Sequence, residues 1–457
     1  MLEDTIVALA TPPGESGIAI IRLSGKEAVR IAGNLFQPYY GQIMSEVPSH
    51  KLTLGWLLED KEPLDQILCV IMYGPHSYTG EDTAEFHCHG GMYVVHSCLR
   101  LCQQAGARMA MPGEFTQRAF LNGRIDLSQA EAIANIINAQ SKKGLQIAAG
   151  QLKGQLRDLI NAMEEDFIAM DALIIASMDF PDDVGDVDRM SIRESLIAIK
   201  QKLDRWLEAA GRNEIYRTGI RLVICGKPNV GKSSLLNCLI QKDKAIVTDI
   251  PGTTRDIIED FINIAGIPVK IIDTAGLRET DDVVEKIGVS KTKTAVETAD
   301  IVLFMLDVTT GATVGDWQAY AEIRGKAPII LVYNKIDADH TVDFAETAKQ
   351  FSLPEWVSIS IQNDLGIGDL QELIYSQALG SATRQEEMAV MVNLRQRDAM
   401  ERCRQQVENL LATVDTETLD CLSIDVQNAL DALGEISGKS LAEDILDRIF
   451  RDFCIGK

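Results

Sequence analysis

Apolar residues in the first part of the chain form short runs separated by turns. Residues 18–23 (IAIIRL) and 68–72 (LCVIM) are bounded by glycine, proline and serine, as buried strands are. Clusters of turn-forming residues flank these runs, at 11–17 before the first and at 74–80 after the second. The pattern predicts a mixed α+β domain over residues 1–126.

After residue 126 glycine becomes rarer and apolar residues recur every three or four positions. This spacing predicts long amphipathic helices, first over 127–212 and again after residue 385. From about residue 220 to 380, strands and loops alternate with helices, which is typical of a parallel α/β sheet. We therefore predict an α/β domain inserted into one helical domain, although the sequence does not prove that the two helical stretches pack together. The predicted parts are 127–215, 216–380 and 381–457.

The composition is that of an ordinary globular protein, with 46% hydrophobic and 24% charged residues among 457. A formal net charge of −23 argues against a protein that coats nucleic acid, because phosphates would be repelled. Any RNA contact therefore requires a local basic patch or a partner. Scattered cysteines, the absence of a signal-peptide pattern and the shortness of the apolar runs predict a cytoplasmic protein without a membrane contact.

Residues 226–233 (GKPNVGKS) carry the strongest chemical pattern in the chain. They follow an apolar strand at 221–225 and open a helix at 234–240, which is the context that a phosphate-binding P-loop requires. The glycines let backbone N–H groups surround phosphates at a helix N-terminus. Lys232 would reach the β- and γ-phosphates, and Ser233 would hold Mg²⁺.

Three further motifs follow in the order that a GTPase requires. Asp273 ends a strand in a DTAG motif, where it would act on Mg²⁺ through a water molecule. Asp337, in an NKID motif, can accept from two donors that guanine presents together and adenine does not. The segment 248–256 supplies a switch, with Thr254 as a further Mg²⁺ ligand. The predicted GTP-binding residues are Asn229, Val230, Gly231, Lys232, Ser233, Ser234, Thr248, Asp249, Ile250, Pro251, Gly252, Thr253, Thr254, Asp273, Thr274, Ala275, Gly276, Asn334, Lys335, Asp337 and Ser360.

Two departures from the usual GTPase pattern affect the predicted mechanism. The Ser-Ala-Lys motif, which usually contacts the guanine base, is only partly matched, because Ser360 is followed by Ile361 and Gln362. The glutamine that often orients the attacking water is replaced by Leu277, whose side chain forms no hydrogen bonds. Arg278, Glu279 and Glu285 are polar candidates for this task, and the alternative is that they are solvated charges of a loop.

His87 and His89 are one residue apart on a predicted strand and would face the same way. No third or fourth ligand has a spacing that would join them, so no metal site is predicted there.

Several long segments resemble the MnmE (TrmE) family of tRNA modification GTPases over essentially the whole chain. The resemblance implies a folate-binding N-terminal α+β domain that dimerises, a central helical domain, and an inserted Ras-like P-loop GTPase domain with a mainly parallel sheet. The segments are 5–25 (TIVALATPPGESGIAIIRLSG), 78–91 (YTGEDTAEFHCHGG), 112–133 (PGEFTQRAFLNGRIDLSQAEAI), 226–237 (GKPNVGKSSLLN), 249–256 (DIPGTTRD), 273–288 (DTAGLRETDDVVEKIG) and 453–457 (FCIGK).

The resemblance also implies a role in modifying carbon 5 of the tRNA wobble uridine. A flavoprotein partner of the MnmG (GidA) type would carry FAD and form a heterotetramer with the homodimer. The product would be a carboxymethylaminomethyl-type group, built with a one-carbon unit from 5-formyl- or 5,10-methylenetetrahydrofolate. The alternative is a regulatory or ribosome-assembly GTPase switch, but such a switch needs a basic RNA module and none is apparent.

By the same resemblance, the folate contacts fall on Arg22, Glu85, Arg124 and Lys457. A pterin has donor edges that suit a carboxylate, and the glutamate tail of a folate suits arginines. Without the resemblance, Arg22 and Arg124 would be interpreted as ordinary surface charges. Cys454 has two open interpretations: a nucleophilic thiolate, or part of a tail that docks to complete a pocket.

K⁺ is a further cofactor that the resemblance implies. The side-chain carbonyl of Asn229 could coordinate it beside the β- and γ-phosphates, together with backbone groups around Thr248, Ile250 and Thr253. The ion would be ordered when two GTPase domains meet, and Glu285 would orient the attacking water. The predicted catalytic residues are Glu285, Asn229, Lys232 and Arg278.

Overall fold

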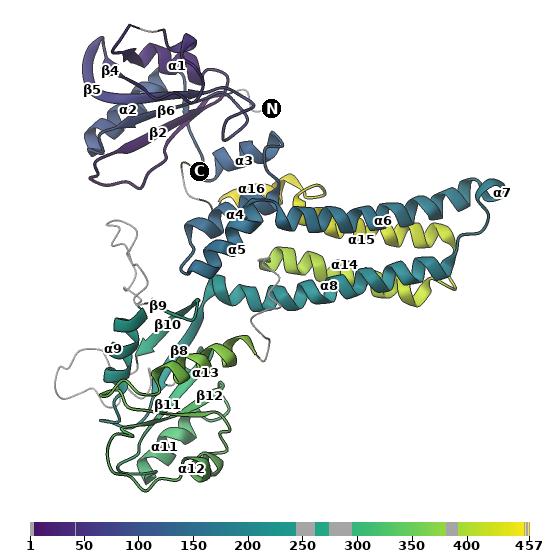
Figure 1. Cartoon of the computed structure of the whole chain (residues 1–457). Coiled ribbons are helices and arrows are strands. Elements are labelled where there is room, and N and C mark those ends of the chain that lie inside the picture. The colour runs from purple at the N-terminus through teal and green to yellow at the C-terminus, as the bar shows by residue number, and fades with distance from the viewer. Residues whose placement is uncertain are drawn as a thin grey trace.

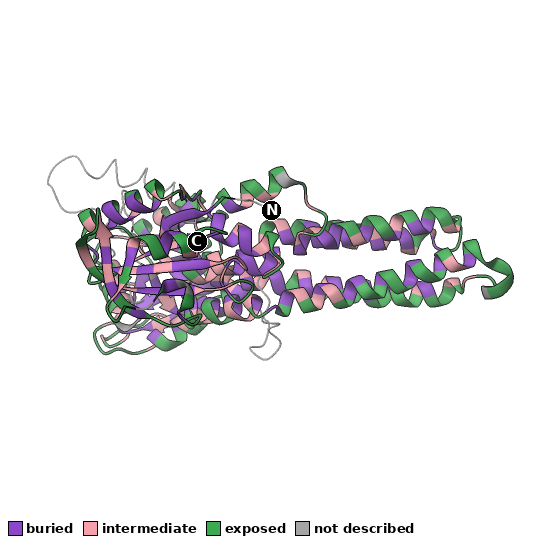
Figure 2. Cartoon of the chain, turned by 90° about the horizontal axis from the view of Figure 1, so that it is seen from above, coloured by how far each residue is buried: buried purple, intermediate pink, exposed green. Residues whose placement is uncertain are grey.

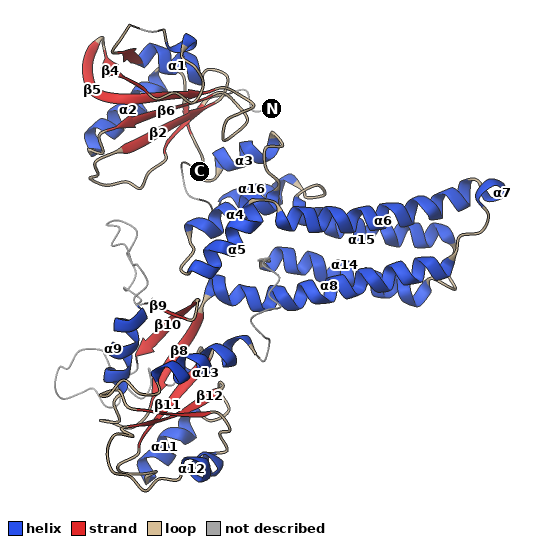
Figure 3. Cartoon of the chain, in the orientation of Figure 1, coloured by secondary structure: helices blue, strands red, loops and turns tan. Residues whose placement is uncertain are grey.

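The computed structural model describes residues 4–41, 43–243, 261–273, 295–380 and 392–451, together with Phe453 and Gly456. Figure 1 shows an N-terminal sheet domain, an elongated helical arm, and a second sheet domain on the other side of the base of the arm. Colouring by secondary structure in Figure 3 places the described strands in the two sheet domains. The predicted combination of α+β, helical and α/β parts is confirmed.

The N-terminal domain contains a seven-stranded sheet of order β3-β4-β5-β6-β2-β1-β7. Neighbouring strands are antiparallel except β1 and β7, which are parallel. Two helices and one 3₁₀ turn share its apolar core. These elements are β1 (Ile6–Leu9), β2 (Ala19–Ser24), α1 (Ala28–Leu35), β3 (Phe36–Pro38), η1 (Met44–Glu46), β4 (Thr53–Glu59), β5 (Glu62–Met72), β6 (Thr83–Cys88), α2 (Met92–Gln104) and β7 (Arg108–Met109).

The α/β domain contains a six-stranded sheet of order β13-β12-β11-β8-β10-β9. Neighbouring strands are parallel except β9 and β10, which are antiparallel. Apolar residues are buried in two separate cores, as expected for a parallel sheet that helices cover on both faces. The elements are β8 (Ile220–Cys225), α9 (Lys232–Asp243), β9 (Phe261–Ile264), β10 (Ile267–Asp273), β11 (Ile301–Asp307), α11 (Val314–Ile323), β12 (Ile329–Asn334), α12 (Phe344–Phe351), β13 (Trp356–Ile359) and α13 (Ile367–Leu379).

Four long helices form the arm, and shorter helices lie at its ends. The long helices are α6 (Gln155–Asp179), α8 (Arg189–Thr218), α14 (Leu394–Thr413) and α15 (Leu419–Ser437). All four contribute to one hydrophobic core, although the α/β domain separates them in sequence. Figure 2 shows buried and exposed positions alternating along these helices. The shorter helices are α3 (Glu114–Leu121), α4 (Leu127–Ile137), α5 (Lys142–Leu152), α7 (Pro181–Val184) and α16 (Glu443–Arg451).

Helix α8 is longer than its apolar pattern predicts. The pattern covers 191–211, whereas the helix runs to Thr218 and therefore continues past residue 215. Its last turn carries Tyr216, which is buried in the core of the α/β domain, with its hydroxyl 3.2 Å from that of Tyr375 on α13. The end of the helix is therefore packed into the α/β domain, and Gly219, with φ +70°, follows its last residue. Among the described helices, none combines the length and apolarity needed to cross a membrane.

Candidate functional site

The loop between β8 and α9 closes tightly over the first turn of α9. Gly231 has φ +105°, and a Cβ at this position would lie 2.4 Å from Nδ2 of Asn334, so a side chain does not fit. Lys232 Nζ donates to the backbone oxygens of Gly226 and Lys227, each at 2.8 Å. The ammonium is thus held within a turn of backbone at a helix N-terminus, which is the arrangement that binds phosphates.

The last residue of β12 and the residue that follows it contact the phosphate-binding loop. Nδ2 of Asn334 donates to the backbone oxygen of Val230 at 2.8 Å, and Nζ of Lys335 lies 3.2 Å from the backbone oxygen of Asn229. Lys335 also forms an ion pair with Asp307 at 2.6 Å. Burial acts to raise the pKa of Asp307, but hydrogen bonds, the largest from Lys335, outweigh it and lower the pKa. The ionised pair ties the NKID motif to the end of β11, and the bonds to Val230 and Asn229 hold it against the phosphate-binding loop.

The exposed Asp337 lies at the same edge of the sheet and is held from the next strand. The hydroxyl of Ser360, a fully buried residue, donates to Oδ1 of Asp337 at 2.5 Å. The backbone N–H of Asn363 donates to the same hydroxyl oxygen at 3.1 Å. This chain of bonds orients the Asp337 carboxylate, although the Ser-Ala-Lys pattern around Ser360 is only partly matched.

Lys227 provides a contact that the sequence analysis missed. Its Nζ lies 3.1 Å from Oδ2 of Asp316, a residue with no solvent exposure, and also bonds the hydroxyls of Thr310 and Thr313. The phosphate-binding loop is thereby tied to the N-terminus of α11. The only local signal in the sequence is the Thr-x-x-Asp spacing of a helix capping box at 313–316.

A cavity of about 490 Å³ lies between the N-terminal sheet and α4. Isoleucines of α4, including Ile133 and Ile136, make one wall apolar, while Arg22, Arg124 and Tyr78 supply polar groups. Its size and lining are those of small-molecule sites. The fold thus brings Arg22 and Arg124 to one cavity, and adds Tyr78 and Gln129, which the sequence analysis did not single out.

Arg22 is part of a largely buried ion pair. Its Nε lies 2.7 Å from Oε1 of Glu85, and the two side chains are 19% and 14% exposed. The guanidinium carbon also lies 5.2 Å from the centre of the Tyr78 ring, within the range of a cation–π interaction. Burial acts to raise the pKa of Glu85, but His87 and Arg22 outweigh it and lower the pKa. Glu85 is therefore an ionised acceptor beside the cavity.

Gly456, near the C-terminus, lies against the strand pair that carries Arg22. A Cβ at Gly456 would lie 2.2 Å from the backbone oxygen of Leu9, so only glycine allows this approach. Leu9 is in β1, which pairs with β2 so that Ala8 faces Arg22.

Comparison with known proteins gives a match over the full chain. A profile of the MnmE helical domain matches residues 127–454, and a profile of the GTP-binding protein TrmE N-terminus matches residues 5–124. The chain is 47% identical over 459 residues to the tRNA modification GTPase MnmE of Syntrophomonas wolfei subsp. wolfei, with 100% of both chains covered. The chain belongs to the MnmE family. The MnmE of Desulforamulus reducens is 43% identical over 462 residues, again with 100% of both covered.

Among solved structures, the G domain of T. maritima FeoB matches 35% of this MnmE-family chain and 98% of its own length, at 26% identity and a TM-score of 0.27.

Several predicted site residues of this MnmE-family chain lie outside the described residues. For Asp273 the backbone is described, at the end of β10, and Ser233 and Ser234 are exposed in the first turn of α9. The residues outside the description are Thr248, Asp249, Ile250, Pro251, Gly252, Thr253, Thr254, Thr274, Ala275, Gly276, Leu277, Arg278, Glu279, Glu285, Cys454 and Lys457.

The two histidines of the His-Cys-His segment bind different carboxylates. His87 Nε2 lies 3.3 Å from Glu85, whereas His89 follows the end of β6 and its Nδ1 lies 2.7 Å from Asp65. Within the described ranges, no group of three or more His, Cys, Asp and Glu residues could hold a metal ion.

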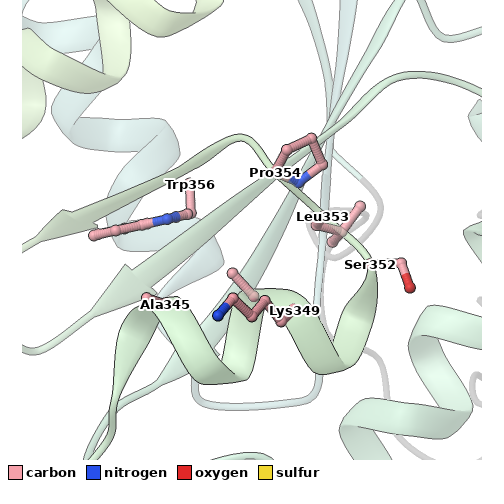
Figure 4. Close-up of a pocket in the computed structure, with 7 residues that line it drawn as sticks. Ala345, Lys349, Ser352, Leu353, Pro354 and Trp356 are labelled. Carbon is pink, nitrogen blue, oxygen red and sulfur yellow. The ribbon is translucent and has the colours of Figure 1, made fainter.

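Another cavity, of about 480 Å³, lies beside α12 in the α/β domain (Figure 4). Trp356 and Leu353 contribute apolar surface, and Lys349 is the charged residue in its lining. None of its lining residues belongs to the phosphate-binding loop or the NKID motif, so it is separate from the candidate nucleotide site.

Proposed function

We propose that this chain hydrolyses GTP to GDP and phosphate and uses the reaction in modifying the wobble uridine of tRNA. The observation that carries the proposal is the full-length relationship to MnmE proteins, at 47% identity over 459 residues. Membership of this family makes the chain a GTP-hydrolysing enzyme of tRNA modification.

In this proposal the loop at 226–233 binds the phosphates of GTP through backbone N–H groups and Lys232. The hydrogen bonds from Asn334 and Lys335 hold that loop in place, and Asp337, oriented by Ser360, reads the guanine edge. GTP is thus bound between loops that follow three parallel strands.

Mg²⁺ would be held by Ser233, by Thr254 and, through water, by Asp273. The hydroxyl of Ser233 fits this role because it is exposed at the first turn of α9, next to Lys232, and Mg²⁺ prefers oxygen ligands. When bound, Mg²⁺ neutralises negative charge on the phosphates.

Hydrolysis without the usual glutamine is assigned to other groups of the chain. Asn229 contributes an oxygen to a K⁺ site, with backbone around Thr248, Ile250 and Thr253, and two GTPase domains complete the site when they meet. Glu285 orients the attacking water, and Arg278 is the further candidate of the switch. The support from the described residues is that Asn229, with φ +67°, projects from the phosphate-binding loop as an exposed residue.

A tetrahydrofolate, in its 5-formyl or 5,10-methylene form, would occupy the cavity of Arg22 and Arg124. The ionised Glu85 beside it suits the donor edge of a pterin, and the apolar wall of α4 suits a flat ring. Lys457 would complete the site, which the close approach of Gly456 to β1 supports. Cys454 would act either as a nucleophile or as part of the docked tail.

The proposed reaction requires a partner. An MnmG/GidA-type flavoprotein would supply FAD and join a homodimer of this chain in a heterotetramer, which adds a carboxymethylaminomethyl-type group to carbon 5 of the wobble uridine. The folate would supply the one-carbon unit.

Full-length protein is expected to bind 5-formyltetrahydrofolate saturably in equilibrium dialysis. Arg22→Ala should weaken binding roughly 10- to 100-fold, because a hydrogen bond to a charged group contributes about 1.5–3 kcal/mol. Arg30→Ala is the matched control, since Arg30 lies in the same domain but is exposed and pairs with Glu27. Absence of saturable binding, or equal binding by Arg22→Ala, would argue against the folate site.

Cells lacking the protein are expected to lose the modified wobble uridine from their tRNA, as measured by mass spectrometry of tRNA nucleosides. Wild-type protein should restore it and Lys232→Ala should not, because the phosphates lose their cation. Lys326→Ala, which changes a lysine paired with Glu297, should restore it as well. Unchanged wobble uridines in the deletion strain would instead favour a regulatory GTPase switch.

A further inference from the structure

A second cavity adjoins the proposed folate cavity, and we propose that it binds the γ-linked polyglutamate tail of the folate. The chain would then prefer polyglutamylated folates to the monoglutamate. This inference rests on the folate site proposed above and adds the class of folate that the site takes.

The two cavities share one wall. The second has a volume of about 440 Å³ and shares Arg124, Ile125 and Gln129 with the first. Its other side is formed by the start of α6 and by residues that follow α15, including Arg157 and Lys439. Both cavities are lined by Gln129 of α4, a helix that lies at the base of the arm in Figure 1. In the proposed complex, the folate would pass Arg124, which lines both cavities, to reach the second.

The polarity of the first cavity sets the direction in which a folate would lie. The pterin belongs beside Arg22 and Glu85, because its donor edge needs an ionised acceptor and Glu85 is the acceptor bonded to Arg22. Arg22 lines only the first of the two cavities, whereas Arg124 lines both. The glutamate end of the same molecule is thus directed towards Arg124 and the second cavity.

The charge of the second cavity suits a chain of carboxylates. Arg124, Arg157 and Lys439 line it, against the single carboxylate of Asp126. Each γ-linked glutamate adds one α-carboxylate, so a longer tail brings one more negative charge for every residue. Asp158 and Glu164 pair with two of these cations from outside the lining, so the excess of cations holds for the cavity wall itself.

Arg157 and Lys439 can bind a ligand carboxylate because their bonds within the protein leave donors unused or are weak. Arg157 is 41% exposed and pairs with the neighbouring Asp158, itself 66% exposed, and such surface pairs contribute little. Lys439 is 58% exposed and donates to Asn161 and Glu164 at 3.2 and 2.5 Å. An ammonium has three donors, so a carboxylate can bind without displacing these two partners.

The test compares the mono- and triglutamate forms of 5-formyltetrahydrofolate in equilibrium dialysis with the full-length protein. Wild type is expected to bind the triglutamate about tenfold more tightly, from one to two added charge-assisted contacts. In the double variant Arg157→Gln with Lys439→Gln, this preference should fall below about twofold while monoglutamate affinity stays unchanged. Glutamine is a polar, uncharged side chain, so the variant removes both positive charges while the positions stay hydrophilic.

A matched double variant, Arg193→Gln with Lys202→Gln, should keep the preference. These residues are also cations of the arm, with side chains 33% and 48% exposed, and they pair with Asp415 and Asp166, but they do not line either folate cavity. Equal affinity of wild type for the two folates, or an undiminished preference in the first double variant, overturns the inference while the folate site stands. Failure of both folates to bind overturns the folate site and the inference together.

Discussion

GTP turnover by the full-length protein is expected to be at least about a hundredfold faster in KCl than in NaCl at equal ionic strength. An arginine finger that stabilises charge on the transferring phosphate raises the rate by ~10³–10⁵, and a bound monovalent cation serves the same electrostatic purpose. In the proposed mechanism Asn229 would supply one ligand for this cation, because it is an exposed residue at the turn of the phosphate-binding loop. Its side chain forms no hydrogen bond within the described part of the chain, so its carbonyl is free to coordinate an ion.

Two substitutions test the role of the K⁺ ion and the role of Glu285 separately. Asn229→Ala should remove the difference between the salts, and Glu285→Ala should abolish turnover in both, because the attacking water is no longer oriented. Glu297→Ala changes an exposed glutamate of the same domain and should leave turnover unchanged. Steady-state phosphate release measures all of these rates. Equal rates of wild type in the two salts would eliminate the ion from the mechanism, and an active Glu285→Ala would eliminate the role given to Glu285.

Asp337→Asn should lower the affinity for GTP by at least about a hundredfold and shift preference towards xanthosine triphosphate. The carboxylate accepts from two donors of guanine, and replacing it leaves those donors unpaired in the site. The hydroxyl of Ser360 already bonds Oδ1 of Asp337, so the new amide would keep its carbonyl there and present N–H to the base. The 2-oxo group of xanthine accepts from such a donor, whereas the 2-amino group of guanine does not.

Titration calorimetry with the three nucleotides measures this change in preference. The control is Asp339→Asn, which alters an exposed aspartate two residues away and should leave the order GTP over ATP intact. Equal affinities of the wild-type protein for GTP and ATP would show that Asp337 does not select the base.

The lengths of the helices show how well the spacing of apolar residues predicts where a helix begins and ends. Apolar spacing predicts a helix over 423–433, and the structure extends it to Leu419–Ser437. Ser423, where the predicted helix begins, and Ser437, where the observed helix ends, are polar but buried. Ser423 donates to Asp171 on α6 and Ser437 to the backbone oxygen of Gly434. A pattern based on polarity counts such positions as solvent-facing, so it ends helices too early.

Local sequence by itself determined the strand, loop and helix of the phosphate-binding turn, as well as the order of the motifs. These features depend on neighbours in sequence: glycine at positive φ, a helix N-terminus directly after a buried strand, and carboxylates at strand ends. The family, too, followed from contiguous segments. These features can be predicted without knowing which helices and strands pack against each other.

Only the tertiary structure decided the features that join distant segments. It places Phe167 of α6 and Leu433 of α15 in one core, so the helices before and after the α/β domain form one arm. It also brings Arg22 and Arg124 to one cavity, and buries Asp316 beneath Lys227. In each case the partners are far apart in sequence, and neither residue alone identifies the other as its neighbour. Their proximity depends on the packing of whole elements, which local patterns do not encode.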